Sequence, residues 1–139
     1  DVNLNMGVFN ENKKLTFYLM HPSTLNTFKK EESDNYVKIG HTLLGEELIE
    51  VKLLSDILSS VNDGVFPDFM SIDIEGLDLL VLKTINYTAN YPKVICVETT
   101  IYDGKKVDQR KNTEIIEFLL SQGYTIYADT FINTIFYKK

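Results

Sequence analysis

The chain has 139 residues, of which 44% are apolar and 24% are charged, which is typical of a folded protein with one hydrophobic core. It carries 14 basic and 20 acidic residues, and the net charge of −6 argues against binding to nucleic acid, since phosphate contacts need a basic surface. No apolar run approaches the ~20 residues that span a bilayer, no signal peptide is recognisable, and the single cysteine cannot form an internal disulfide, so we expect a cytoplasmic protein without a membrane partner.

The first half of the chain predicts strands joined by polar segments. Residues 2–9 and 15–20 each show the alternation of a strand, and the turn residues between them predict a hairpin. The polar segment 21–45 has no clear period, and so long a connection in a small domain is usually functional or mobile. Residues 47–54 alternate weakly as a further strand, after which Ser55 can cap a short helix.

The middle of the chain predicts two buried strands joined by a helix. The apolar runs at 66–74 and 93–99 are typical of parallel strands that are covered on both faces. The segment 76–85 is apolar almost all round, which indicates a helix packed on several sides. Such a helix is the expected right-handed crossover between the two strands. A polar loop is predicted at 102–111.

The end of the chain predicts one helix and a hairpin. Asn112 or Thr113 can cap a helix that Gly123 ends, and residues 124–128 and 133–137 alternate as two strands. The order of elements therefore predicts an α/β fold with a mostly parallel sheet and a C-terminal antiparallel hairpin. We expect all 139 residues to belong to a single domain.

Carboxylates follow both buried strands. Asp73 and Glu75 end the first run two residues apart, and so on one face if the strand continues, while Glu98 ends the second. Neighbouring parallel strands lie ~4.8 Å apart. We therefore expect Asp73 or Glu75 to share a site with Glu98 at the carboxyl edge of the sheet, where α/β proteins bind ligands. Gly76 allows a turn or a close approach there. Such acids can act as a general base, orient a hydroxyl, hold a cation, or only cap the following helix.

Common phosphate, nucleophile and zinc motifs are missing. The sequence contains no Walker loop, no GxGxxG and no GxSxG. His21 and His41 are isolated in a polar segment, which is typical of surface residues. One cysteine in an apolar strand offers no zinc-finger spacing. No metal site is predicted from these residues.

Several segments in order resemble the FkbM-type methyltransferases, a class I S-adenosylmethionine-dependent family. The segments are 68–76 with 81–82, 92–99, and 123–124 with 127–130 and 133–136, preceded by 5–8, 15–18 and 23–28. The resemblance covers nearly the whole chain and is strongest over residues 67–139. The family's glycine-rich cofactor loop and its ribose-binding acid have no counterpart here. We therefore expect a partial Rossmann-like domain whose N-terminal strands and cofactor loop are missing, and the fragment alone is expected to be inactive.

The resemblance implies methyl transfer from S-adenosylmethionine to an oxygen, often a hydroxyl of a sugar, a polyketide or a similar small molecule. By position, Asp73 would lie near the methionine end of the cofactor and near the acceptor. Glu75 and Glu98 would line the acceptor side, and Asn5 and Gly7 would lie near the adenine. The reaction is an in-line displacement, so positioning supplies most of the catalysis.

Two other interpretations remain open from the residues themselves. The first is a metal enzyme in which Asp73, Glu75 and Glu98 hold magnesium or manganese for hydrolysis or glycosyl transfer. The second is a non-catalytic remnant that serves as a binding or structural module. A small-molecule acceptor is the expected partner, and a sheet without its first strands would expose an edge through which copies of the chain self-associate.

Overall fold

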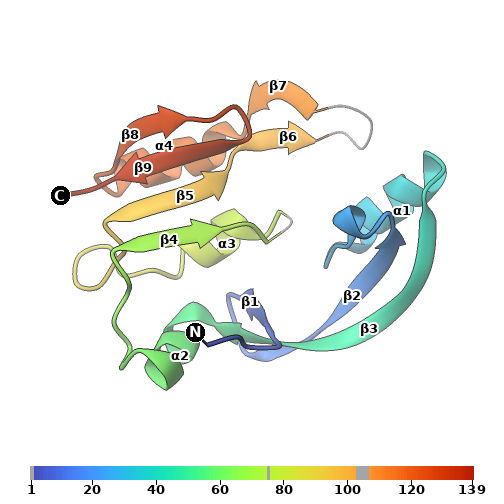
Figure 1. Ribbon diagram of the computed structural model, residues 1–139, viewed down its shortest axis with the longest axis horizontal. Coiled ribbons are helices and arrows are strands. Elements are labelled where there is room, and N and C mark those ends of the chain that lie inside the picture. Colours follow the sequence, from blue (N-terminus) through green and yellow to red (C-terminus); the bar gives the residue numbers. More distant parts are fainter. Residues whose placement is uncertain (1, 75, 103–106) are drawn as a thin grey trace.

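The computed structural model describes residues 2–74, 76–102 and 107–139 and shows a mixed α/β protein with two main sheets (Figure 1). The strands are β1 (Gly7–Phe9), β2 (Lys13–His21), β3 (Thr42–Leu53), β4 (Phe69–Ile72), β5 (Val94–Glu98), β6 (Thr100–Tyr102), β7 (Val107–Lys111), β8 (Thr125–Asp129) and β9 (Asn133–Tyr137). The helices are the 3₁₀ turn η1 (Ser23–Leu25) and α1 (Lys30–Lys38), α2 (Leu54–Val61), α3 (Asp78–Leu82) and α4 (Thr113–Ser121).

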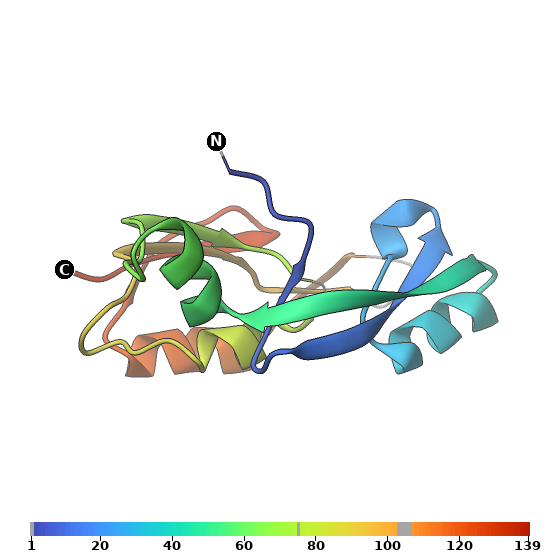
Figure 2. The same cartoon turned by 90° about the horizontal axis from the view of Figure 1, so that it is seen from below.

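The C-terminal half forms a four-stranded sheet in the order β4-β5-β9-β8. The strands β4 and β5 are parallel, as expected, and β9 is antiparallel to both β5 and β8. Three of the four strands therefore run in one direction. The helices α3 and α4 lie together on one face of this sheet (Figure 2). The expected C-terminal hairpin of β8 and β9 is confirmed.

The hydrophobic core lies between the four-stranded sheet and these two helices. Ile95, Val97 and Phe136 are fully buried there, because alternate residues of β5 and β9 face α3 and α4. The predicted limits of α4 are confirmed as well. Asn112 is the N-cap and accepts a hydrogen bond from the Ile115 amide, and Gly123, with a φ of +88°, follows the helix in a left-handed conformation.

The predicted N-terminal hairpin is wrong in its pairing. The two strands exist as β1 and β2, but β3 lies between them, in the order β1-β3-β2. Gly7 and Lys13 both align with Val51 of β3, the first in a parallel and the second in an antiparallel ladder. Alternation indicates that a segment is a strand but does not choose its neighbour. Here the buried side chain of Val51 belongs to the strand in the centre.

Two predicted loops contain regular structure. The segment 21–45 holds η1, α1 and the beginning of β3, and the segment 102–111 holds most of the ribbon formed by β6 and β7. The helix α1 has no apolar period, because Ser33 is its buried residue and its other turns carry charges. An exposed ion pair between Lys30 and Asp34, four residues apart, adds a small contribution on its outer face.

Smaller differences concern helix ends. The crossover helix α3 is shorter than expected, although hydrogen bonds from Thr84 and Ile85 extend its last turn. Ser55 does not cap α2, whose N-cap is Leu53 without a side-chain hydrogen bond. Within the described part of the chain, no helix has the length and apolar character needed to cross a membrane.

Candidate functional site

The carboxyl ends of β4 and β5 bring two of the predicted acids together. Ile72 of β4 aligns with Val97 of β5, so Asp73 and Glu98, the next residues, follow at the same level of the sheet. This confirms that the ends of the two strands meet at one edge. Glu75, the third predicted acid, lies outside the described residues.

Asp73 and Glu98 line different cavities at that edge. Asp73 is exposed and lines a cavity of about 180 Å³ together with Val8 of β1 and Leu54 of α2. Glu98 is half-buried and lines a larger cavity of about 450 Å³. The sequence predicted a single shared site, whereas the structure places the two carboxylates in the walls of two separate cavities.

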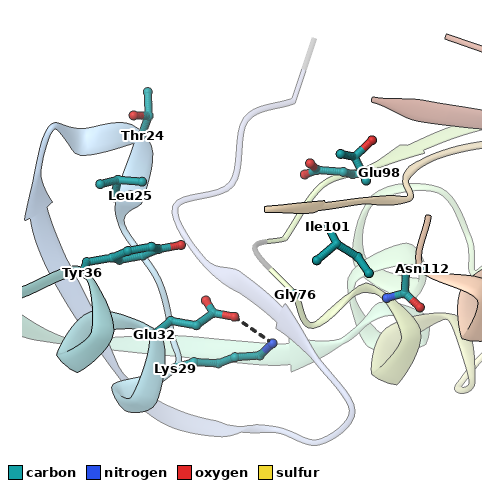
Figure 3. Close-up of a pocket in the computed structure, with 10 residues that line it drawn as sticks. Thr24, Leu25, Lys29, Glu32, Tyr36, Gly76, Glu98, Ile101 and Asn112 are labelled. Atoms are coloured by element: carbon teal, nitrogen blue, oxygen red, sulfur yellow. Dashed lines mark hydrogen bonds and ion pairs between the residues drawn. The ribbon is translucent and has the colours of Figure 1, made fainter. Parts of the chain in front are cut away.

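The larger cavity lies between the two halves of the molecule (Figure 3), the N-terminal half with the three-stranded sheet and α1, and the C-terminal half with the four-stranded sheet, α3 and α4. One wall comes from η1 and α1, and the other from the end of β5, the strand β6 and the cap of α4. Glu98 and Gly76 were singled out from the sequence, and the remaining lining residues were not. The lining residues are Thr24, Leu25, Lys29, Glu32, Tyr36, Gly76, Glu98, Thr100, Ile101 and Asn112.

The electrostatics of Glu98 suit proton transfer. Burial raises the pKa of the Glu98 carboxyl above its ordinary value, and the nearby charges of Asp73 and Asp78 raise it further. A carboxylate with a raised pKa is a stronger base than an ordinary glutamate. The side chain opens onto a cavity large enough for a small molecule, since ligand sites are typically about 300–1,000 Å³.

Asp78 is a further acid of this edge that sequence reasoning missed. It is only 5% exposed, and its Oδ1 accepts a hydrogen bond from the Ile74 amide at 3.2 Å. Burial is the main cause that raises the pKa of Asp78, and the charge of Asp73 adds to it. The signal was its place in the first turn of an apolar helix, where an acid can close the preceding turn.

Gly7 and Asn5 lie apart from the carboxylates. Asn5 is exposed and precedes β1. Gly7 lies in β1, where an added Cβ would come within 2.8 Å of Val51 Cγ1 and 3.2 Å of Phe28 Cζ. Close packing therefore explains the glycine by itself, and a role for either residue near an adenine stays a prediction.

The structure does not assemble the metal centre of the alternative interpretation from the described residues. Among residues 2–74, 76–102 and 107–139, no group of three or more His, Cys, Asp or Glu side chains could hold a metal ion. The proposed set of Asp73, Glu75 and Glu98 includes one residue outside these ranges. The two described members line separate cavities.

Comparisons with known proteins identify the family. No curated protein and no solved structure matches the chain. The family described as the Methyltransferase FkbM domain matches residues 1–126, which is most of the chain. The match includes β4, β5 and both walls of the larger cavity. The chain therefore belongs to the FkbM methyltransferase domain family.

Proposed function

We propose that this chain is part of an S-adenosylmethionine-dependent methyltransferase that methylates a hydroxyl group of a small molecule. Membership of the FkbM family supports methyl transfer in general. Methylation of a hydroxyl is supported by Glu98, a half-buried carboxylate that lines a polar cavity of about 450 Å³ and whose pKa is raised. Thr24, Thr100 and Asn112 supply hydrogen-bonding groups to the same cavity.

The fold supports the same proposal. In class I methyltransferases the cofactor and acceptor meet at the carboxyl edge of a Rossmann-like sheet. We infer that β4-β5-β9-β8 corresponds to one side of such a sheet, in which three strands run in one direction and β9 runs against them. The chain is then a partial domain of this fold, and the candidate residues lie where ligands of α/β sheets bind.

The residues present fit one end of the cofactor. The carboxylate of Asp73 suits the ammonium of the methionine end. The cavity that Asp73 lines has a volume of about 180 Å³, which is smaller than a typical ligand site. Bound cofactor supplies the electrophilic methyl group. Glu98 takes the proton of the acceptor hydroxyl, and Asp73 fixes the orientation of the methionine end. Glu75 is assigned to the acceptor side, and Asn5 and Gly7 to the adenine side.

Calorimetric titration tests the proposal. S-adenosylhomocysteine is titrated into the longest natural form of the protein and into the 139-residue chain. We expect binding by the longer form and weak or no binding by the shorter one, because the glycine-rich loop of the family is not among these residues. Absence of binding by both forms would reject the cofactor assignment.

A screen for methyl transfer to hydroxyl compounds follows, with a donor labelled in its methyl group. Label transferred to an oxygen supports the proposed reaction. Transfer to nitrogen or carbon alone would keep the cofactor but reject O-methylation.

Self-association is a separate prediction that the sheet order supports. The strand β4 pairs only with β5 among the described strands, and Phe69 on it is 56% exposed. On the other side of the sheet, Ile126 of the edge strand β8 is 49% exposed, and Tyr137 of the neighbouring β9 is 38% exposed. We expect sedimentation to show dimers or larger species at high concentration. A stable monomer at all concentrations would contradict the prediction.

A further inference from the structure

Lys29 is a cation that the structure places in the wall of the larger cavity. It immediately precedes α1, and its side chain is 39% exposed. Its Nζ lies 3.1 Å from Glu32 Oε1. Figure 3 shows this ion pair on the wall formed by η1 and α1, with Glu98 on the wall across the cavity. The place of Lys29 in this cavity was not predictable from the sequence, because the segment has no recognisable period.

The ammonium of Lys29 is held by a small network. Thr27, which is 1% exposed, donates from Oγ1 to Glu32 Oε2 at 2.8 Å and accepts from the Lys29 amide at 3.1 Å. The other oxygen of Glu32 accepts from Lys29 Nζ. Exposed ion pairs usually contribute little because both side chains are mobile. Here a buried threonine fixes the carboxylate, so the ammonium is fixed as well.

Gly76 brings the same ammonium against the turn that follows β4. A Cβ added at Gly76 would overlap Lys29 Nζ and lie 3.3 Å from Glu32 Oε1. The φ of Gly76 is +82°, a left-handed conformation that favours glycine. The glycine therefore serves two purposes at once. It permits the turn, and it leaves room for a lysine that comes from the other half of the molecule.

We propose that Lys29 positions the acceptor, donating a hydrogen bond from its ammonium to the oxygen that will be methylated. This inference rests on the proposed function. An ammonium has three N–H donors, and Glu32 takes one of them in the described structure, which leaves donors that can reach an oxygen in the cavity. The positive charge also stabilises the oxygen as its proton leaves.

In the proposed transfer, groups on both walls of the cavity act on the acceptor hydroxyl. The acceptor O–H bond breaks, and its proton goes to Glu98. The oxygen, held by Lys29, forms a bond to the methyl carbon. The bond from that carbon to the sulfonium sulfur breaks, and its electron pair stays on the sulfur, so that S-adenosylhomocysteine is released. Glu32 and Thr27 hold Lys29 in place and take no part in the transfer.

The kinetic test compares Lys29→Met with Lys30→Met. Lys30 is the next residue, is 68% exposed and pairs with Asp34 at 2.9 Å, so it is a matched control. In the longest natural form of the protein, with an acceptor from the screen, we expect Lys29→Met to lower kcat/KM about 100-fold. Lys29→Arg should recover part of the loss, and Lys30→Met should leave kcat/KM unchanged. Equal effects of the two methionine substitutions would overturn the proposal.

A second measurement does not depend on catalysis. The protein is labelled with ¹³C and ¹⁵N in lysine, the Lys29 signal is assigned by its loss in Lys29→Met, and glycerol is added as the hydroxyl probe. We expect the Lys29 signals to shift while those of Lys30 stay in place. Shifts of neither, or equal shifts of both, would overturn the proposal. If Lys29 responds and no methyl transfer occurs with any acceptor, the proposed reaction fails while the hydroxyl-binding site stands.

Discussion

The four-stranded and the three-stranded sheets are stabilised in different ways. Beneath α3 and α4, Val97 and Phe136 are 0% exposed and belong to one continuous core. In the three-stranded sheet, β3 buries Val51 but leaves Leu44 and Leu48 66% and 71% exposed. The first sheet shares one continuous core with two helices, whereas the second buries fewer apolar side chains, among them Met20 and Tyr18 of β2. Substitutions of similar kind should therefore have different effects in the two halves.

The largest expected effect is a cavity in the four-stranded half. Phe136→Ala should lower the free energy of unfolding by about 3–5 kcal/mol, because it removes a fully buried ring. Leu48→Ala should change it by less than about 0.5 kcal/mol. Urea denaturation followed by circular dichroism measures both. If Phe136→Ala does not fold, Phe136→Leu gives the milder case. Equal losses at Phe136 and Leu48 would contradict the difference in apolar burial between the two sheets.

The same difference decides how much of the fold the sequence predicted. The strands 93–99 and 133–137 and the helix after Asn112 were found because apolar residues recur with the period of a buried element. The pairing of β1 and β2 was wrong, and α1 was missed. The alternation of β1 and β2 does not show that β3 pairs with both of them, and α1 buries Ser33 rather than an apolar residue, so its sequence has no apolar period.

The residues of the candidate site also differ in how well the sequence predicted them, according to the half of the molecule from which they come. Glu98 and Gly76 were predictable because they end or follow apolar strands of the four-stranded half. Lys29, Glu32 and Thr24 come from a segment that predicted only a polar loop. Their contribution to the cavity depends on how the two halves pack, which local pattern does not encode. Asp73 was predicted at the correct edge, and the division into two cavities was not.

The next largest effect tests the four-stranded wall of the site. In the longest natural form of the protein, Glu98→Gln should lower the rate of methyl transfer by roughly 10²–10⁴-fold, the usual contribution of a general base. Burial raises the pKa of Glu98. As the pH is lowered, the wild-type enzyme should therefore begin to lose activity at a higher pH than an enzyme whose base is an ordinary glutamate. Glu98→Gln should lose this dependence. The control is Glu117→Gln, an exposed residue of α4. If Glu98→Gln keeps the pH profile of the wild type, Glu98 is not the base.

A smaller effect concerns how the four-stranded half holds its last strand. Lys138, after β9, lies over the rings of Tyr91, Tyr124 and Tyr87 at 4.2, 5.8 and 6.0 Å, and it donates to the Tyr87 carbonyl at 2.7 Å. Lys138→Ala should lower the free energy of unfolding by about 1–2 kcal/mol. Lys139→Ala, the control, should change it little. Thermal unfolding compares the two, and equal melting temperatures would contradict the contribution of the tyrosine rings.

The smallest expected effect is the dependence of stability on the ionisation of Asp78. Because burial raises its pKa, the folded protein holds this proton more tightly than the unfolded chain. The stabilisation is fully present below the ordinary pKa of aspartate and is lost as the pH rises to the raised value. Asp78→Asn keeps an acceptor for the Ile74 amide but cannot ionise, so the free energy of unfolding should decline less over this window. Urea titrations at stepped pH measure the decline, with exposed Asp63→Asn as the control. Identical pH slopes for wild type and Asp78→Asn would mean that burial at this edge does not hold the proton, and the case for a raised pKa at neighbouring Glu98 would weaken with it.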